Sequence, residues 1–280
     1  MDNKELLRFG QAYKKVLNLI QTIVDSQRND NKIARFGFNN RILILRSGGC
    51  GETSLLRYLS EHLPLESNEK DKEDRSFCVV KYYCLPIIVL GSFEYNNDIL
   101  MTVITNLFSE AKKKMRVTEN TGDDVICKDL LNQFEKVLKS LNVIKSERSF
   151  YTLESLNQRS DSENLREHMS QLVNRFLEYQ GYGGESRLVL LMDDILMSVC
   201  APEMLEQMRK YLEIDNLIII VSTNIVQLSQ IMQENYRSAF KSAIENNNKA
   251  FTFDVEELAD KYLLKMFPSS RRVVANSSET

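Results

Sequence analysis

A glycine-rich stretch contains the residue types most suited to chemistry, and it reads Arg46-Ser47-Gly48-Gly49-Cys50-Gly51-Glu52-Thr53-Ser54. In a phosphate-binding turn of the pattern G-x-x-x-x-G-K-[ST], backbone N–H groups surround the phosphates, the lysine contacts them and the hydroxyl binds Mg²⁺. Gly51 and Thr53 match this pattern, whereas Arg46 replaces the first glycine and Glu52 replaces the lysine. The stretch therefore indicates a phosphate-binding turn. The alternative is a glycine-rich turn in which Thr53 or Ser54 caps a helix.

Two adjacent carboxylates follow an apolar run later in the chain. Residues 188–192 are all apolar, and Asp193 and Asp194 come directly after them. This is the form of a Walker B segment, in which the first carboxylate would bind Mg²⁺ together with Thr53 and the second would polarise an attacking water. The alternative is that the two carboxylates cap the next helix or are simply solvated.

Polar residues also follow the next apolar run. Residues 217–221 precede Ser222-Thr223-Asn224, where the carboxyl edge of a sheet would face a ligand, and a polar side chain such as Asn224 could sense a phosphate there. Near the C-terminus, Arg271 and Arg272 could contact the same phosphate, although a solvated pair explains them equally well. The order of these motifs along the chain is more informative than any one of them.

Strands and helices that could position these residues alternate along the sequence. Short apolar runs predict strands at 41–45, 187–192 and 217–221, and a further strand within 77–90 that is interrupted or ends near Pro86. Helical periodicity predicts helices at 4–25, 53–63, 97–115, 125–141, 165–179, 203–212, 225–246 and 256–267. Polar stretches at 66–75, 116–124 and 145–163 predict exposed loops. The alternation predicts a three-layer α/β fold whose mainly parallel sheet is covered on both faces.

Composition excludes several other classes of protein. The 280 residues include 36 Lys+Arg and 39 Asp+Glu, a net charge of −3 that disfavours nucleic acid as a partner. No apolar run approaches the roughly 18 residues of a membrane-spanning helix, and the N-terminus lacks a secretory signal, so we expect a cytoplasmic protein without a membrane partner. Five scattered cysteines and two isolated histidines fit neither a disulfide framework nor a histidine-based metal site.

The chain resembles bacterial P-loop NTPases of the AAA+/STAND type, near the KAP-like ATPases. The segments that carry the resemblance are residues 41–54, 85–88, 188–195 and 204–212. It implies a three-layer P-loop NTPase with added helices, divided into a helical lead-in (1–40), an NTPase-like domain (41–272) with a helical insertion at about 116–180, and a polar tail (273–280). It also implies an ATP-driven regulatory switch that uses ATP and Mg²⁺, with a protein partner or self-assembly, and several proteins of this type act in phage defence.

The resemblance assigns a role to each candidate residue. It implies that Thr53 and Asp193 bind Mg²⁺ and that Asp194, Asn224 and Arg272 act in catalysis. The implied nucleotide contacts are Arg46, Gly48, Gly49, Cys50, Gly51, Glu52, Thr53 and Ser54.

Three departures from the family pattern affect the expected activity. Family members carry Gly, Lys and an acidic residue where this chain has Arg46, Glu52 and Leu196. Each unit-charge interaction at 4 Å is worth about 4 kcal/mol at an effective dielectric of 20, so exchanging lysine for glutamate weakens phosphate binding unless Arg46 supplies the missing charge. We therefore expect weak or lost hydrolysis. A pseudo-ATPase that serves as an interaction module and an α/β binding domain unrelated to P-loop proteins are the alternatives.

Overall fold

The computed structural model describes residues 3–29, 39–45, 52–69, 80–89, 98–117, 124–145, 164–197, 200–241 and 254–275. The α-helices are α1 (Asn3–Asn29), α2 (Glu52–Glu69), α3 (Ile99–Val117), α4 (Asp124–Lys145), α6 (Leu165–Tyr179), α7 (Ala201–Tyr211), α8 (Ile225–Ala239) and α10 (Val255–Met266). The strands are β1 (Arg41–Leu45), β2 (Lys81–Cys84), β3 (Ile88–Val89), β4 (Ser186–Asp193), β5 (Leu217–Thr223) and β6 (Arg272–Val274), and two short 3₁₀ helices are η3 (Ile195–Met197) and η4 (Ser269–Arg271).

The strands form one six-stranded sheet in the order β2-β4-β5-β1-β6, and every pairing in it is parallel. At one edge, β2 and β3 both pair with β4, and they are separated by the segment that contains Pro86. This confirms the α/β class and the mainly parallel sheet. It also agrees with the expected interruption of the edge strand, because proline cannot donate a ladder hydrogen bond.

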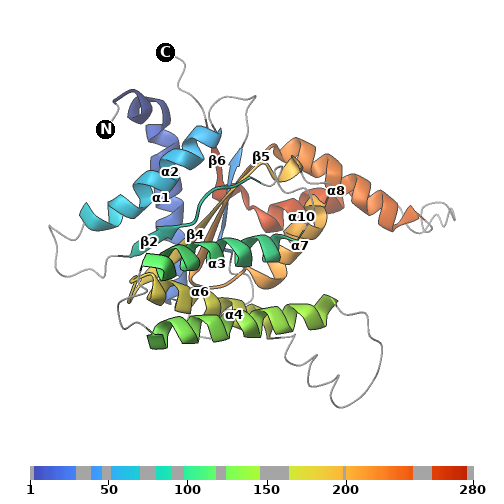
Figure 1. The fold of residues 1–280 in the computed structure, drawn as a ribbon. Coiled ribbons are helices and arrows are strands. Elements are labelled where there is room, and N and C mark those ends of the chain that lie inside the picture. Colours follow the sequence, from blue (N-terminus) through green and yellow to red (C-terminus); the bar gives the residue numbers. More distant parts are fainter. Residues whose placement is uncertain are drawn as a thin grey trace.

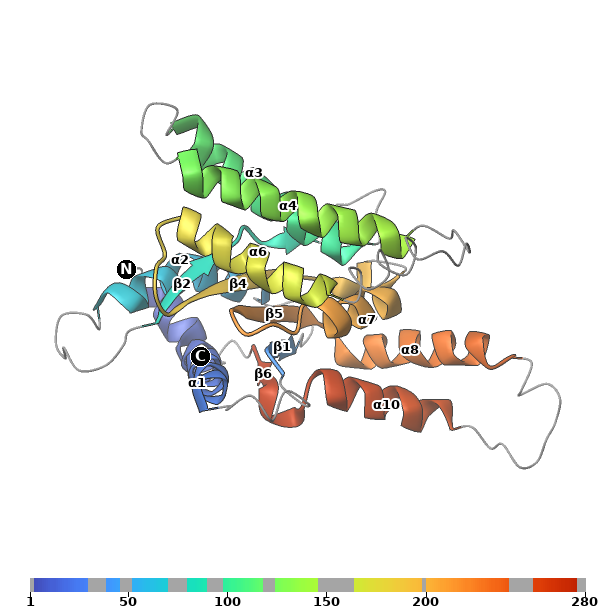
Figure 2. The same ribbon diagram turned by 90° about the horizontal axis from the view of Figure 1, so that it is seen from below.

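Alternate residues of the central strands point into two separate cores. Figure 1 shows α1 and α2 on one side of the sheet and α3 and α7 on the other. One face of the sheet, here called the α2 face, packs against α1 and α2 and contains Ile42, Ile44, Val189, Leu191, Ile218 and Ile220. The opposite α7 face packs against α3, α6, α7, α8 and α10 and contains Leu43, Leu188, Leu190, Met192, Leu217, Ile219 and Val221. Figure 2 shows α4 as an outer helix with α6 between it and the sheet. Burial on both faces explains why β4 and β5 are continuous apolar runs.

The direction of the connections decides which face each helix covers. The connections from β3 to β4, from β4 to β5 and from β5 to β6 all advance toward the β6 edge, and their helices lie on the α7 face. The connection from β1 to β2 runs in the opposite direction, and its helix α2 lies on the opposite face. Crossovers between parallel strands share one hand, so reversing the direction must change the face. The helices that follow β1 and β5 therefore diverge at the carboxyl ends of these adjacent strands, which is where open α/β sheets bind ligands.

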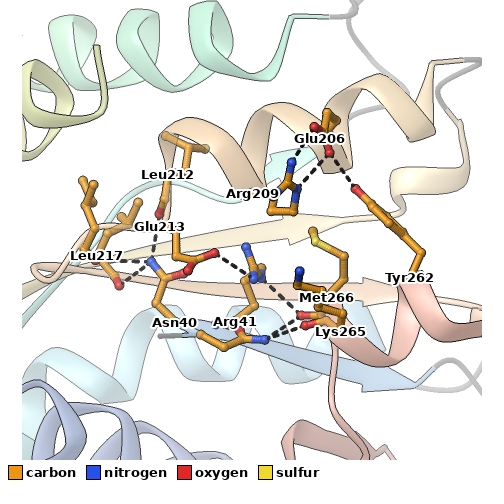
Figure 3. A network of polar contacts seen from close by, with 12 residues as sticks. Asn40, Arg41, Glu206, Arg209, Leu212, Glu213, Leu217, Tyr262, Lys265 and Met266 are labelled. Carbon is orange, nitrogen blue, oxygen red and sulfur yellow. Dashed lines mark hydrogen bonds and ion pairs between the residues drawn. The ribbon is translucent and has the colours of Figure 1, made fainter. Parts of the chain in front are cut away.

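A buried polar network lies at the amino ends of the parallel strands, where β1 begins (Figure 3). The side-chain amide of Asn40 donates to the backbone carbonyls of Leu212 and Leu217, at 2.9 Å each, and to that of Ile214 at 3.3 Å. The guanidinium of Arg41 donates to the carbonyl of Met266 and pairs with the carboxylate of Glu213, each at 3.2 Å. These contacts bind the start of β1 to the segment before β5 and to the end of α10.

The largest differences from the sequence prediction concern α2, α8 and β6. Helix α2 continues through Pro64 to Glu69, so the first part of the predicted loop at 66–75 is helical. Helix α8 ends at Ala239 rather than near 246, in a region where no glycine or proline marks the end in the sequence. Strand β6 was not predicted, because two consecutive valines are too short a run to recognise; it extends the sheet beyond residue 272, where the predicted domain ended.

Candidate functional site at the carboxyl edge of the sheet

The first turn of α2 meets the end of β4 through a side-chain hydrogen bond. The hydroxyl of Thr53 donates to Oδ2 of Asp193 over 2.6 Å. Asp193 lies on the α2 face because it follows Leu191, a core residue of that face, by two positions in a strand. Its side chain is 8% exposed, so this carboxylate is almost fully buried beside the start of a helix. The structure therefore brings into contact two residues that the sequence predicted to bind Mg²⁺ together.

The strand register places a further hydroxyl beside this pair. Ser222 pairs with Asp193 on one side and with Ile44 on the other, so the three residues form one row across β4, β5 and β1. The side chain of Ser222 shares the α2 face with Asp193, because Ile218 and Ile220 precede it on that face. Its Oγ is buried and has no hydrogen-bond partner among the described residues.

Asp194 turns the chain away from the sheet. Its φ of 54° lies in the left-handed region, where it is the only non-glycine residue of the described segments. Its backbone N–H donates to the carbonyl of Ser222 over 3.1 Å, which joins the end of β4 to β5 before η3 begins. Aspartate tolerates this conformation better than most residues do, and such backbone outliers gather at functional sites.

Asn224 has a structural task at the start of α8. Its Oδ1 accepts hydrogen bonds from the backbone N–H groups of Val226 and Gln227, at 3.0 and 3.2 Å. Asn224 is therefore the N-cap of α8, a position for which asparagine is among the preferred residues. Because Oδ1 is an acceptor in the helix cap, the amide nitrogen Nδ2 is the group of this side chain that could donate to a phosphate.

The structure does not bring Arg272 to the Thr53–Asp193 pair. Arg272 lies on β6 opposite Leu43, and alternation with the buried Val273 directs its side chain to the α7 face. Its Nε donates to the carbonyl of Phe267 over 2.8 Å, and burial lowers its pKa. Burial also lowers the pKa of the neighbouring Arg271. In this arrangement Arg272 links β6 to the end of α10.

The remaining residues of the predicted turn lie mostly outside the described part of the chain. These are Arg46, Gly48, Gly49, Cys50 and Gly51. Glu52 is the first residue of α2, and Ser54 is exposed in its first turn.

The oxygen ligands at this edge fit a magnesium ion bound together with a nucleotide. Magnesium in such sites takes one or two carboxylates and completes its shell with phosphate oxygens and water. Asp193 and Thr53 supply one carboxylate and one hydroxyl within hydrogen-bond distance of each other, next to the buried hydroxyl of Ser222. The described residues contain no cluster of three or more His, Cys, Asp or Glu side chains that would bind a metal without a nucleotide.

Comparisons with known proteins do not assign this chain to a family. No protein-family model and no curated protein matches the chain. Among the described helices, none combines the length and hydropathy that crossing a bilayer requires.

Sequence reasoning gave no separate role to Ser222. It treated Ser222, Thr223 and Asn224 as one polar strand end, although they differ in direction. Counting alternate positions back through the strand separates Ser222, on the α2 face with Asp193, from Thr223, on the α7 face. The signal was therefore present in the period-two pattern.

Proposed function

We propose that the chain binds a magnesium–nucleotide complex, in the first place ATP, at the carboxyl edge of its sheet, and acts as an ATPase-like regulatory switch in the cytoplasm. The observation that carries the proposal is the hydrogen bond between Thr53 and Asp193. It joins a hydroxyl just after a glycine-rich turn to a carboxylate at the end of a buried strand. These are the two side chains that hold Mg²⁺ in P-loop NTPases.

The location of the pair supports an anionic ligand. An 18-residue helix begins at Glu52, directly after the glycine-rich stretch, and a helix N-terminus attracts phosphate through its free N–H groups and its dipole. The helices after β1 and β5 diverge at this point, which is the position where open α/β sheets bind ligands. When bound, Mg²⁺ would neutralise phosphate charge, and Thr53 and Asp193 would hold it.

Glu52 argues for weak or absent hydrolysis. In place of the lysine that attracts the phosphates, it adds a negative charge at the start of α2. The resulting loss of binding free energy is several kcal/mol at most, and solvent and Mg²⁺ reduce it. The same residue motivates a second candidate function, a pseudo-ATPase that binds a protein partner or a second copy without any nucleotide.

Thermal unfolding with and without Mg²⁺-ATP tests the proposal. Ligand at a hundredfold excess over its Kd stabilises the fold by about 2.7 kcal/mol, which raises the melting temperature measurably. We expect a rise in the native chain that Asp193→Ala abolishes. Asp215→Ala is the matched control, because this exposed aspartate lies before β5 at the opposite edge of the sheet.

The Glu52→Lys variant separates the two candidate functions. The native chain could show no stabilisation by Mg²⁺-ATP while Glu52→Lys gains it. In that case the site has kept its geometry but no longer binds nucleotide, and the pseudo-ATPase function is the correct one. If neither chain responds, nucleotide binding at this edge is wrong. Equal loss of the response in Asp193→Ala and Asp215→Ala would also contradict the proposed site.

A further inference from the structure

A cavity lies on the α7 face, away from α2. Its volume is about 500 Å³, and its walls come from α3, α4, α7, α8 and α10. Small-molecule sites commonly have volumes of 300–1,000 Å³, with apolar walls and a few polar groups that fix the ligand's orientation. The Thr53–Asp193 pair faces the other side of the sheet, so this cavity is independent of the proposed nucleotide site.

One face of α7 places two side chains that carry acceptors in the wall of the cavity. Glu203 and Gln207 both line it, and a spacing of four residues places them on the same side of the helix. The Oε1 atom of Gln207 is buried and has no hydrogen-bond partner within the described chain. The carboxylate of Glu203 forms no ion pair with any described residue. The cavity thus offers the carboxylate of Glu203, and the unpartnered carbonyl oxygen of Gln207 lies buried in the wall one turn away.

The nearest cations are already engaged. The carboxylate of Glu206 receives two hydrogen bonds from Arg209, at 2.7 and 3.0 Å, and one ion-pair contact from Lys210 at 3.2 Å. The hydroxyl of Tyr262 donates to the same carboxylate over 3.3 Å (Figure 3). Because Glu206 holds both cations, they do not neutralise Glu203 on the neighbouring turn.

Aromatic and apolar groups complete the walls. Tyr211, Tyr236 and Tyr262 come from three different helices, and Leu100 and Met232 are apolar wall residues. Tyrosine rings accept cations over their faces and pack against flat apolar groups. Such walls favour a ligand with a flat apolar body.

We propose that this cavity is a binding site for a small organic amine with an aromatic body. The ammonium group would pair with Glu203 and, once the Gln207 side chain rotates toward the cavity, donate to its Oε1. The aromatic body would lie among the tyrosine rings. The site is additional to the proposed nucleotide site and does not depend on it.

Three indole probes of matched shape test the proposal in the absence of nucleotide. They are tryptamine, which carries an ammonium, tryptophol, which carries a hydroxyl, and indole-3-propionate, which carries a carboxylate. We measure binding to the full chain by calorimetry and by saturation-transfer NMR. We expect saturable binding of tryptamine, weaker binding of tryptophol and the weakest binding of indole-3-propionate.

Variants on α7 connect the binding to this cavity. Glu203→Lys should weaken tryptamine at least fivefold, and Gln207→Met should weaken it three- to tenfold by removing an acceptor at similar volume. Glu256→Lys is the matched control, since Glu256 is also an exposed first-turn glutamate but does not line the cavity. No binding of tryptamine, equal binding of all three probes, or an equal effect of Glu203→Lys and Glu256→Lys would overturn the proposal. Circular dichroism confirms that each variant is folded.

Discussion

The hydroxyl of Thr53 donates a 2.6 Å hydrogen bond to the carboxylate of Asp193, across 140 residues of sequence. The bond joins the first turn of α2, the helix that follows β1, to the last residue of β4, which β5 separates from β1 in the sheet. It exists because Asp193 faces the one sheet face on which α2 packs. A typical hydrogen bond contributes only a small net free energy to folding. The main consequence of this one is that it fixes the positions of two oxygen atoms next to each other.

Substitutions at Thr53 should separate its hydroxyl from its shape. Thr53→Val keeps the volume but removes the donor, and we expect it to abolish the stabilisation by Mg²⁺-ATP, about 2.7 kcal/mol at a hundredfold excess over Kd. Thr53→Ser keeps the hydroxyl and should retain the response. Thermal shift at millimolar ATP measures both. Retention of the response in Thr53→Val would remove this hydroxyl from the ligand set.

A change of Asp194 to asparagine should uncouple binding from chemistry. Asparagine tolerates the left-handed φ of 54° as aspartate does. We therefore expect the free energy of unfolding of Asp194→Asn to lie within about 0.5 kcal/mol of that of the native chain. Mg²⁺-ATP binding should remain, and any phosphate release should disappear. Asp194→Val is the backbone control and should lose about 1–3 kcal/mol through strain. A phosphate-release rate unchanged in Asp194→Asn would exclude this carboxylate as the water-orienting group.

Removing Glu213 should destabilise the fold strongly, because it leaves Arg41 buried without its counter-charge. Burial lowers the pKa of Arg41, while the nearby Glu213 acts in the opposite direction. The side chains are 3% and 12% exposed. We expect Glu213→Ala to cost about 3–5 kcal/mol in urea unfolding. The double variant Arg41→Met, Glu213→Leu should recover most of that loss, since an apolar pair needs no counter-charge; a double variant no more stable than the single one would contradict this account.

The cluster around Glu206 should make stability depend on pH in the acid range. The hydrogen bond from Arg209, helped by Lys210, lowers the pKa of Glu206 from 4.5 to about 2. A carboxylate whose pKa is lower in the folded chain stabilises fully above its unfolded value and loses that stabilisation as the pH falls through the folded value. Because Glu206 is 36% exposed, we expect only about 1 kcal/mol.

Urea unfolding of the native chain and of Glu206→Gln at pH 6.5 and pH 3 measures this dependence. The native chain should be the more stable at pH 6.5, and the difference should shrink at pH 3. Glu256→Gln, which removes an exposed glutamate elsewhere, corrects for the overall change in charge. A difference that stays constant between the two pH values would show that the Arg209 and Lys210 contacts do not favour the ionised form of Glu206.

Periodicity predicted most of the fold, because burial on both faces leaves a strong local signal. The apolar runs at 42–45, 188–192 and 217–221 became the central parts of β1, β4 and β5, and the amphipathic helices were recognised from their core spacing. Strand β6 left no such signal, since its pairing with β1 depends on contacts between residues more than 200 positions apart. The continuation of α2 through Pro64 likewise contradicts the local preference of proline.

The candidate site was predictable in its residue types but less so in its geometry. The motif order predicted that Thr53 and Asp193 belong together, and the structure confirms their contact. The motif order could not show that the side chain of Asn224 is used by the cap of α8, or that Arg272 points to the other face of the sheet. Both depend on the direction of a side chain relative to a neighbouring strand or helix. A sequence indicates that direction only where strand residues alternate between the two faces of a sheet.

The strand order has a consequence for synthesis on the ribosome. Strand β1 leaves the ribosome well before its neighbours β5 and β6, which are made only from residue 217 onward. Until then β1 has no described strand to pair with, and β5, which separates β1 from the β4 carboxylate and carries Ser222, is missing. Pairing over such separations is slow and leaves apolar edges exposed meanwhile. We expect the nascent N-terminal half to need protection by chaperones, and the site to form among the last events of folding.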